Sequence, residues 1–246
     1  MARLTNKLAT IDLYQGSTVQ PGPYLVGQLA WDVNGKAFRY CLNGATALVA
    51  GNLVQSPVSA GTTYQNMVVA VAGKVGDTLL NVTNGTSTIT GQQFQGGSIS
   101  IYTAGTDLVG DEYTIVDVQG TLTTGGALKV YLDRPLRYAV TTSATVNMMP
   151  SPFSGVIVCP TTLTGVPVGI AVYAIPANQY GWVQTHGVAP YIPDGTSIVV
   201  GAMVGNSQNA AGSLGLATAG AGIAVVGMAL STAASGKGAV AVLSLD

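Results

Sequence analysis

Charged residues almost disappear from the chain after Tyr138, where only Asp194, Lys237 and Asp246 remain. Over all 246 residues the charged fraction is 8%, compared with about 25% in ordinary soluble domains. The helix formers Glu, Lys and Arg are therefore scarce, while Gly contributes 33 residues, so strands and turns are favoured over helices. A free monomer with this surface would have little charge repulsion to keep it dispersed. We therefore expect partners to cover much of it.

Short apolar runs broken by Gly and Pro predict an all-β fold, built from β-sandwich or barrel domains joined by short linkers. We interpret residues 1–55 as an extended N-terminal arm and a β-hairpin region, residues 56–150 as a β-sandwich or barrel domain, and residues 151–246 as an uncharged C-terminal β domain. The arm covers residues 1 to about 23 and ends at the breaker Gln20-Pro21-Gly22-Pro23. It either reaches a neighbouring subunit or completes its own sheet.

Asn34-Gly35 is the strongest local signal. It lies between the apolar runs 29–31 and 37–41 and predicts a hairpin with a type I′ turn, in which both central residues have positive φ. Further strands are predicted where apolar residues alternate with polar ones or form runs bounded by turn residues. They cover 67–71, 78–82, 98–102, 113–118, 128–132, 155–159, 166–174, 182–188, 198–203, 223–230 and 240–245.

The stretch 176–203 contains one of the two tryptophans and the only histidine. In strand geometry Trp182, Gln184 and His186 face one way. A turn at Pro193-Asp194-Gly195 leads into the apolar run Ile198-Val199-Val200, which is predicted to be a buried strand.

The charge-free run 210–230 has the length of a membrane span. Its glycines disfavour a helix, so we expect a Gly/Ala loop to about Ala221 and then a strand, with no membrane partner.

His186 could serve as a general base or metal ligand with Asp194 as its orienter, but no nucleophile motif accompanies it. A group of carboxylates could donate oxygens to calcium, although the twelve-residue calcium-loop pattern is absent and a solvated strand end is the simpler interpretation. The group consists of Asp107, Asp111, Glu112 and Asp117. We therefore expect neither enzymatic activity nor a cofactor or metal.

Cys41 and Cys159 lack the paired spacing of a zinc or redox motif. We interpret them as small buried hydrophobic residues, with a disulfide as the alternative. The formal net charge of −1 gives no basic footprint for nucleic acid, so we expect no nucleic-acid partner.

Large aromatic side chains and arginines are the residues that most often anchor a protein interface. Arg134 and Arg137 either bind a partner's carboxylate or guard an edge strand together with Pro135. The predicted interface residues are Trp31, Phe38, Arg134, Arg137, Tyr180, Trp182 and His186.

Three stretches of the chain resemble structural proteins of tailed-bacteriophage virions, especially capsid decoration (cement) proteins. They are GQLAWDVNGKAFRYCLNGATALVAGNLVQSP, GGSISIYTAGTDLVGDEYTIVDV with KVYLDRPL, and VVGMALSTAASGKGAVAVLSLD. The resemblance implies a β-rich homo-oligomer, commonly a trimer, that binds the outer face of the phage head and stabilises contacts between major capsid subunits. Such a protein would be made in the host cytoplasm and reside on the virion surface. The resemblance brings no catalytic residues.

The alternative is a head or tail fibre module that binds a receptor or glycan. In that case Tyr180, Trp182 and Tyr191 would form a stacking platform for sugar rings.

Overall fold

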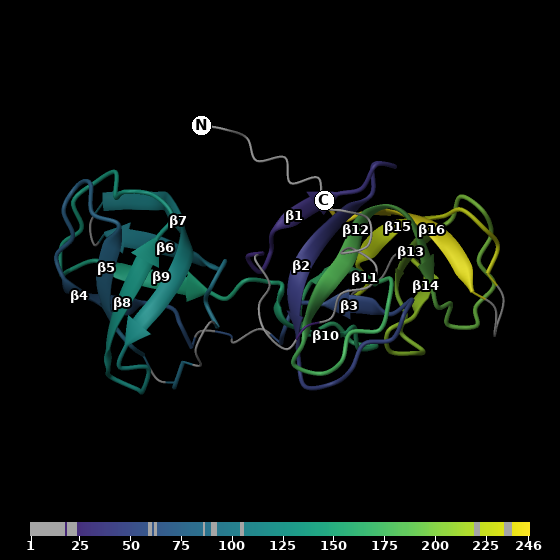
Figure 1. The fold of residues 1–246 in the computed structure, drawn as a ribbon, viewed down its shortest axis with the longest axis horizontal. Coiled ribbons are helices and arrows are strands. Elements are labelled where there is room, and N and C mark those ends of the chain that lie inside the picture. Colours follow the sequence, from purple (N-terminus) through teal and green to yellow (C-terminus); the bar gives the residue numbers. More distant parts are fainter. Residues whose placement is uncertain are drawn as a thin grey trace. The chain divides into compact units, whose positions relative to one another are not determined.

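The computed structural model describes residue 18 and residues 24–58, 61, 63–85, 87–89, 93–103, 106–218, 222–233 and 238–246, with the backbone alone at 103 and 106–110. All sixteen regular elements in these ranges are β-strands, so the predicted all-β fold is confirmed. The strands form two compact units (Figure 1): a barrel unit of residues 60–151 and a larger unit of residues 1–59 and 152–246. Apart from Thr18, the predicted arm lies outside the described residues.

The barrel unit is closed by six strands in the order β4-β5-β8-β7-β6-β9. Alternate side chains point into it: Leu128 and Val130 are buried while Lys129 between them is exposed. The strand period of two thus separates core from surface. The strands are β4 (Met67–Val71), β5 (Leu79–Thr83), β6 (Ser98–Thr103), β7 (Thr106–Gly120), β8 (Ala127–Leu132) and β9 (Thr145–Met149).

The larger unit is a ten-stranded sheet organised around the twelve-residue strand β12. Gln184 of β12 lies between Phe38 of β2 and Ile170 of β11, so both edges of β12 are paired. The strands are β1 (Leu29–Trp31), β2 (Ala37–Asn43), β3 (Leu53–Gln55), β10 (Ser154–Val158), β11 (Pro167–Ala171), β12 (Tyr180–Tyr191), β13 (Met203–Asn206), β14 (Leu214–Leu216), β15 (Val225–Ala229) and β16 (Ala239–Ser244).

Five of these strands follow one another in a closed ring of pairings. β2 pairs with β10, β10 with β3, β3 with β11, β11 with β12, and β12 again with β2. One buried cluster, which includes Cys41, Val54, Val156, Ala171 and Val183, takes residues from all five strands. The ring explains why these short segments, far apart in the chain, fold as one unit.

The second half of the large sheet runs from β12 through β16, β15 and β13 to β14. It curls back on itself, because Leu214 of β14 forms a parallel bridge with Pro193, just beyond the end of β12. A separate buried cluster lies under these strands and includes Ala189, Val204, Val226 and Leu243.

The division of the chain differs from the predicted one. The middle segment 56–150 corresponds closely to the barrel unit, but residues 1–55 and 151–246 do not form separate parts. They share one sheet, since β2 pairs with β12 along the register Tyr180–Leu42 to His186–Ala37. The barrel unit is therefore an insertion between two segments of the larger unit.

The predicted hairpin is confirmed, but its type I′ turn is wrong. β1 and β2 are antiparallel with Trp31 opposite Ala37, and only Gly35 of the Asn34-Gly35 pair has positive φ, at 77°. The carboxylate of Asp32 accepts hydrogen bonds from the backbone N–H groups of Asn34 and Lys36. This side chain stabilises a longer loop that the dipeptide signal alone does not indicate.

The apolar run Ile198-Val199-Val200 is not the predicted strand: Ile198 is buried and forms only an isolated bridge with Ala233, and a turn follows it. Val199 and Val200 are exposed, Gly201 has positive φ, and the strand begins only at Met203. In the charge-free run 210–230 the structure places β14 and β15. The described part of the chain contains no helix of the length and apolarity that a membrane crossing requires.

Candidate functional site

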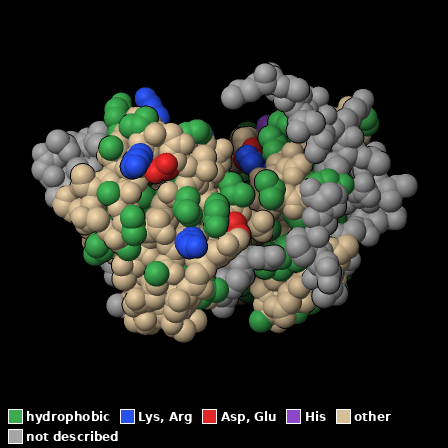
Figure 2. All heavy atoms as spheres, turned by 60° about the vertical axis from the view of Figure 1, so that its left-hand side comes forward, with side chains coloured by type: hydrophobic (Ala, Val, Ile, Leu, Met, Phe, Trp, Pro, Cys, Tyr) green, Lys and Arg blue, Asp and Glu red, His purple; other side chains and the backbone are tan. Residues whose placement is uncertain are grey.

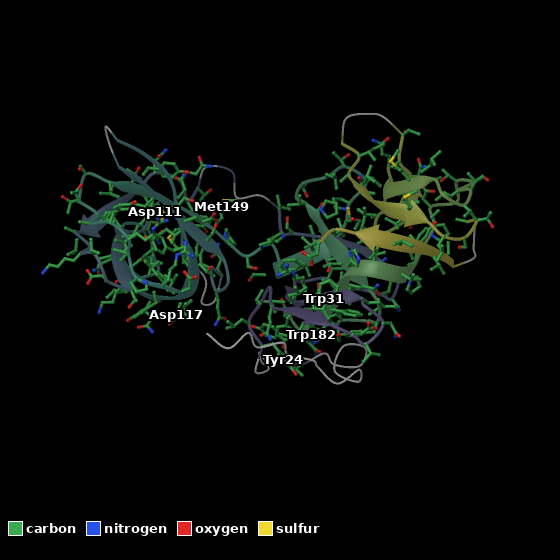
Figure 3. All side chains as sticks on the ribbon, turned by 90° about the horizontal axis from the view of Figure 1, so that it is seen from above. Tyr24, Trp31, Asp111, Asp117, Met149 and Trp182 are labelled. Atoms are coloured by element: carbon green, nitrogen blue, oxygen red, sulfur yellow. The ribbon has the colours of Figure 1, made fainter. Side chains whose placement is uncertain are left out.

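Three of the predicted interface residues, Phe38, Tyr180 and Trp182, are buried in the core of the larger unit. Trp182 packs against Tyr24 and Tyr40 with ring centroids 5.2 and 5.0 Å apart, and Figure 3 shows Tyr24 beside Trp182. In this structure these three side chains are core residues and offer no surface to a partner, contrary to the prediction. Both faces of β2 and β12 are covered here, so strand alternation could not identify the outward one.

The stacking platform proposed for a glycan is also wrong in its geometry. Tyr180, Trp182 and Tyr191 expose 5%, 1% and 2% of their surface, so none offers a ring face to a sugar. Their role in the structure is packing: the rings of Tyr40 and Tyr180 stack at 5.8 Å.

Trp31 and His186 are the predicted residues of this unit that reach the surface. Trp31 is 46% exposed and His186 is partly buried, with their ring centroids 6.1 Å apart. Asp194, the supposed orienter of His186, accepts hydrogen bonds from the backbone N–H and hydroxyl of Thr196 and from the hydroxyl of Ser207. It therefore takes hydrogen bonds from its own turn and from the segment that follows β13.

Arg134 and Arg137 lie in the barrel unit, after β8. The guanidinium of Arg134 stacks over the ring of Tyr113 at 4.9 Å, forms an ion pair with Asp133 at 3.6 Å, and donates to the carbonyl of Glu112. Arg137 is 4.0 Å from a carboxylate oxygen of Asp111. Both side chains are more than half exposed, and their binding to a partner's carboxylate stays a prediction.

The supposed calcium group is not assembled among the residues that can be described. The structure contains no cluster of three or more His, Cys, Asp or Glu side chains suited to a metal there, and the side chain of Asp107 lies outside the description. Figure 3 labels Asp111 and Asp117 on the barrel unit; Asp117 accepts from the backbone N–H of Val118. Cys41 and Cys159 are free and buried, as predicted.

The larger unit carries an exposed apolar face that the sequence pattern did not reveal. Direct cross-strand neighbours there are Val188 and Val242, Val242 and Met228, and Met228 and Met203. We call these four residues the apolar row. They are exposed by 40%, 39%, 52% and 55% in the order Val188, Val242, Met228, Met203.

The apolar row continues into its neighbours on the same face. On one side His186 lies opposite Ser244, and Trp31 packs near His186. On the other side Pro190 lies opposite Val240, whose carbonyl accepts from the N–H of the half-exposed Leu230. No Asp, Glu, Lys or Arg occurs in β12, β13, β15 or β16. Figure 2 brings the barrel unit forward, and the charged side chains on the face that it presents are few and scattered.

The opposite face of the same strands already supplies the core of this part of the sheet. Ala189, Ala241, Leu243, Val226 and Val204 point inward and form the core beneath. Both faces of these strands are therefore apolar, but only the inward face is needed to form the core. Contiguous exposed apolar patches often mark interaction sites.

Comparison with protein-family models, with curated proteins and with solved structures found no match.

Proposed function

We propose that this chain is a structural protein of a tailed-phage virion, a capsid decoration protein that assembles with itself and binds the outer surface of the head. The observation that carries the proposed assembly with neighbouring subunits is the apolar row, an exposed and uncharged strip on the sheet of the larger unit. Burying apolar surface contributes roughly 25 cal/mol per Å² before the costs of association. Because the strip has no charges to desolvate, its burial against neighbouring subunits is not opposed by that penalty.

The all-β architecture supports the same proposal. Both units are held by closed sets of strand pairings, so little backbone ordering would be needed when they bind capsid subunits. The resemblance of the hairpin segment and of the segment ending at residue 246 to decoration proteins agrees with this role. The proposed partners are the major capsid protein and further copies of the chain.

Reconstitution on heads tests the proposal. Heads from a phage whose gene for this chain has been deleted are mixed with the purified full-length protein and sedimented. We expect saturable binding and heads that resist heat or chelation better than undecorated heads. Absence of binding at saturating protein, with heads that are otherwise intact, would contradict the capsid role. Binding to tails alone would favour the fibre alternative.

A further inference from the structure

We propose that the apolar row packs against the same row of another copy of this chain. The inference deepens the proposed function, on which it rests, because it assigns this face to self-assembly and not to the capsid shell. It starts from the register: Val188, Val242, Met228 and Met203 stand side by side across four strands.

The charge pattern favours a second copy over a different protein. In a symmetric contact, a residue close to the axis meets its own equivalent, so any charge there would face a like charge. The four strands that carry the row contain no Asp, Glu, Lys or Arg, which is the composition that a self-contact requires. Recognition of a different partner normally uses complementary charges or polar groups for specificity, and the row presents none.

One pair of opposite charges lies at the end of this face that carries His186 and Ser244, and the two charges neutralise one another. Asp246 follows the last strand, β16, and its carboxylate accepts two hydrogen bonds of 3.0 Å from the guanidinium of Arg39. A second copy approaching this end of the row therefore meets Arg39 and Asp246 as a neutral pair.

The available area is sufficient for a specific contact. Six side chains are exposed by 39% to 55% on this face, namely Trp31, Val188, Met203, Met228, Leu230 and Val242. They offer on the order of 600 Å² of surface per copy, so a symmetric contact would bury about 1,200 Å² in total, above the ~1,000 Å² expected of a specific interface. Two methionines in the row can adapt their unbranched side chains to an opposing surface.

Cysteine cross-linking tests this contact on the full-length chain. The native Cys41 and Cys159 are buried, so a new cysteine at Met228 or Val242 is the reactive thiol in its variant. Under mild oxidation we expect Met228→Cys and Val242→Cys to form disulfide-linked dimers. The matched control is Met149→Cys on β9 of the barrel unit, since Met149 and Met228 are both 52% exposed. Equal yields at positions 228 and 149 would overturn the proposal.

Charge substitution provides the second measurement. Met228→Asp should weaken self-association about tenfold or more in sedimentation analysis, while Met149→Asp should leave it unchanged. Circular dichroism checks that both variants are folded; if Met228→Asp does not fold, the cysteine variants, which keep a small apolar side chain, decide the question.

Head binding of the same variants separates this inference from the proposed function. If Met228→Asp assembles normally but no longer binds heads, the row contacts the shell, and the inference fails while the function stands. If Met228→Cys forms disulfide-linked dimers but the wild-type chain never binds heads, the function fails while the self-contact stands. A chain that stays monomeric at all concentrations overturns the inference.

Discussion

The backbone N–H of Trp182 donates a 2.7 Å hydrogen bond to the hydroxyl of Tyr173. Tyr173→Phe would leave this N–H unpaired beside the aromatic core, which costs about 1–3 kcal/mol of unfolding free energy. Both tryptophans lie in the larger unit, so tryptophan fluorescence during urea unfolding reports this unit. Tyr138→Phe, at an exposed position of the barrel unit, should leave the same transition unmoved. Equal midpoints for the two variants would contradict the assigned role of the Tyr173 hydroxyl.

The two tryptophans should respond very differently to truncation. Trp182 is 1% exposed and packed among tyrosines, so Trp182→Ala should destabilise the larger unit by about 3–5 kcal/mol. Trp31→Ala removes a half-exposed ring and should cost about 1 kcal/mol or less. Calorimetric unfolding of both variants checks this difference. A Trp182→Ala protein of wild-type stability would show that the ring is not part of the core.

Alkaline pH should destabilise the fold. Burial raises the pKa of the Cys41 thiol and that of the Cys159 thiol from 9.0 to about 12. A pKa that is raised in the folded state contributes stability below the ordinary pKa, and this contribution is lost as the pH rises toward 12. Each thiol should therefore lower the unfolding free energy by up to about 1.4 kcal/mol per pH unit above roughly pH 9.

Urea unfolding at a series of pH values from about 8 to 10 measures this slope. Cys41→Ala should reduce the slope of the unfolding free energy against pH by the contribution of one thiol. A slope that is the same in the variant and the wild type would contradict the assignment to Cys41.

Acid pH should weaken the loop that holds Asp194. Burial on its own raises the pKa of Asp194, but the hydrogen bonds from Thr196, Ser207 and Asn209 outweigh burial, and the pKa lies below its ordinary value. The stability from this carboxylate is present above the ordinary pKa of about 3.9 and is lost as the pH falls through the lower folded pKa.

Asp194→Ala should therefore cost about 1–3 kcal/mol at neutral pH. The difference in unfolding free energy between variant and wild type should shrink below about pH 4. A difference that is independent of pH would show that the charge of Asp194 does not stabilise the loop.

The strand patterns predicted five of the six barrel strands but missed β9 and the first part of β7. Alternation is clearest where one face of a strand is polar. In β8, for example, Lys129 lies between Leu128 and Val130 and identifies the outward side. Where both phases are apolar, the pattern loses this information. It could not separate the turn at Val199-Val200 from a buried strand, since the turn depends on the positive φ of Gly201.

The candidate site was harder to predict than the fold. The aromatic residues chosen for an interface, such as Trp182 and Phe38, are core residues because β2 and β12 pair across most of the chain. That pairing joins segments separated by the whole barrel unit, and no local pattern encodes it. The apolar row depends on the register of four strands, which also requires long-range pairing. Only the absence of charge in these strands was visible in the sequence.

Electron microscopy of intact particles tests the central claim most directly. A reconstruction of virions that carry the chain should place both β units on the outer face of the head, bridging major capsid subunits, with copies of the chain in mutual contact. Density for the chain in the tail, or its complete absence from purified particles, would contradict the decoration role.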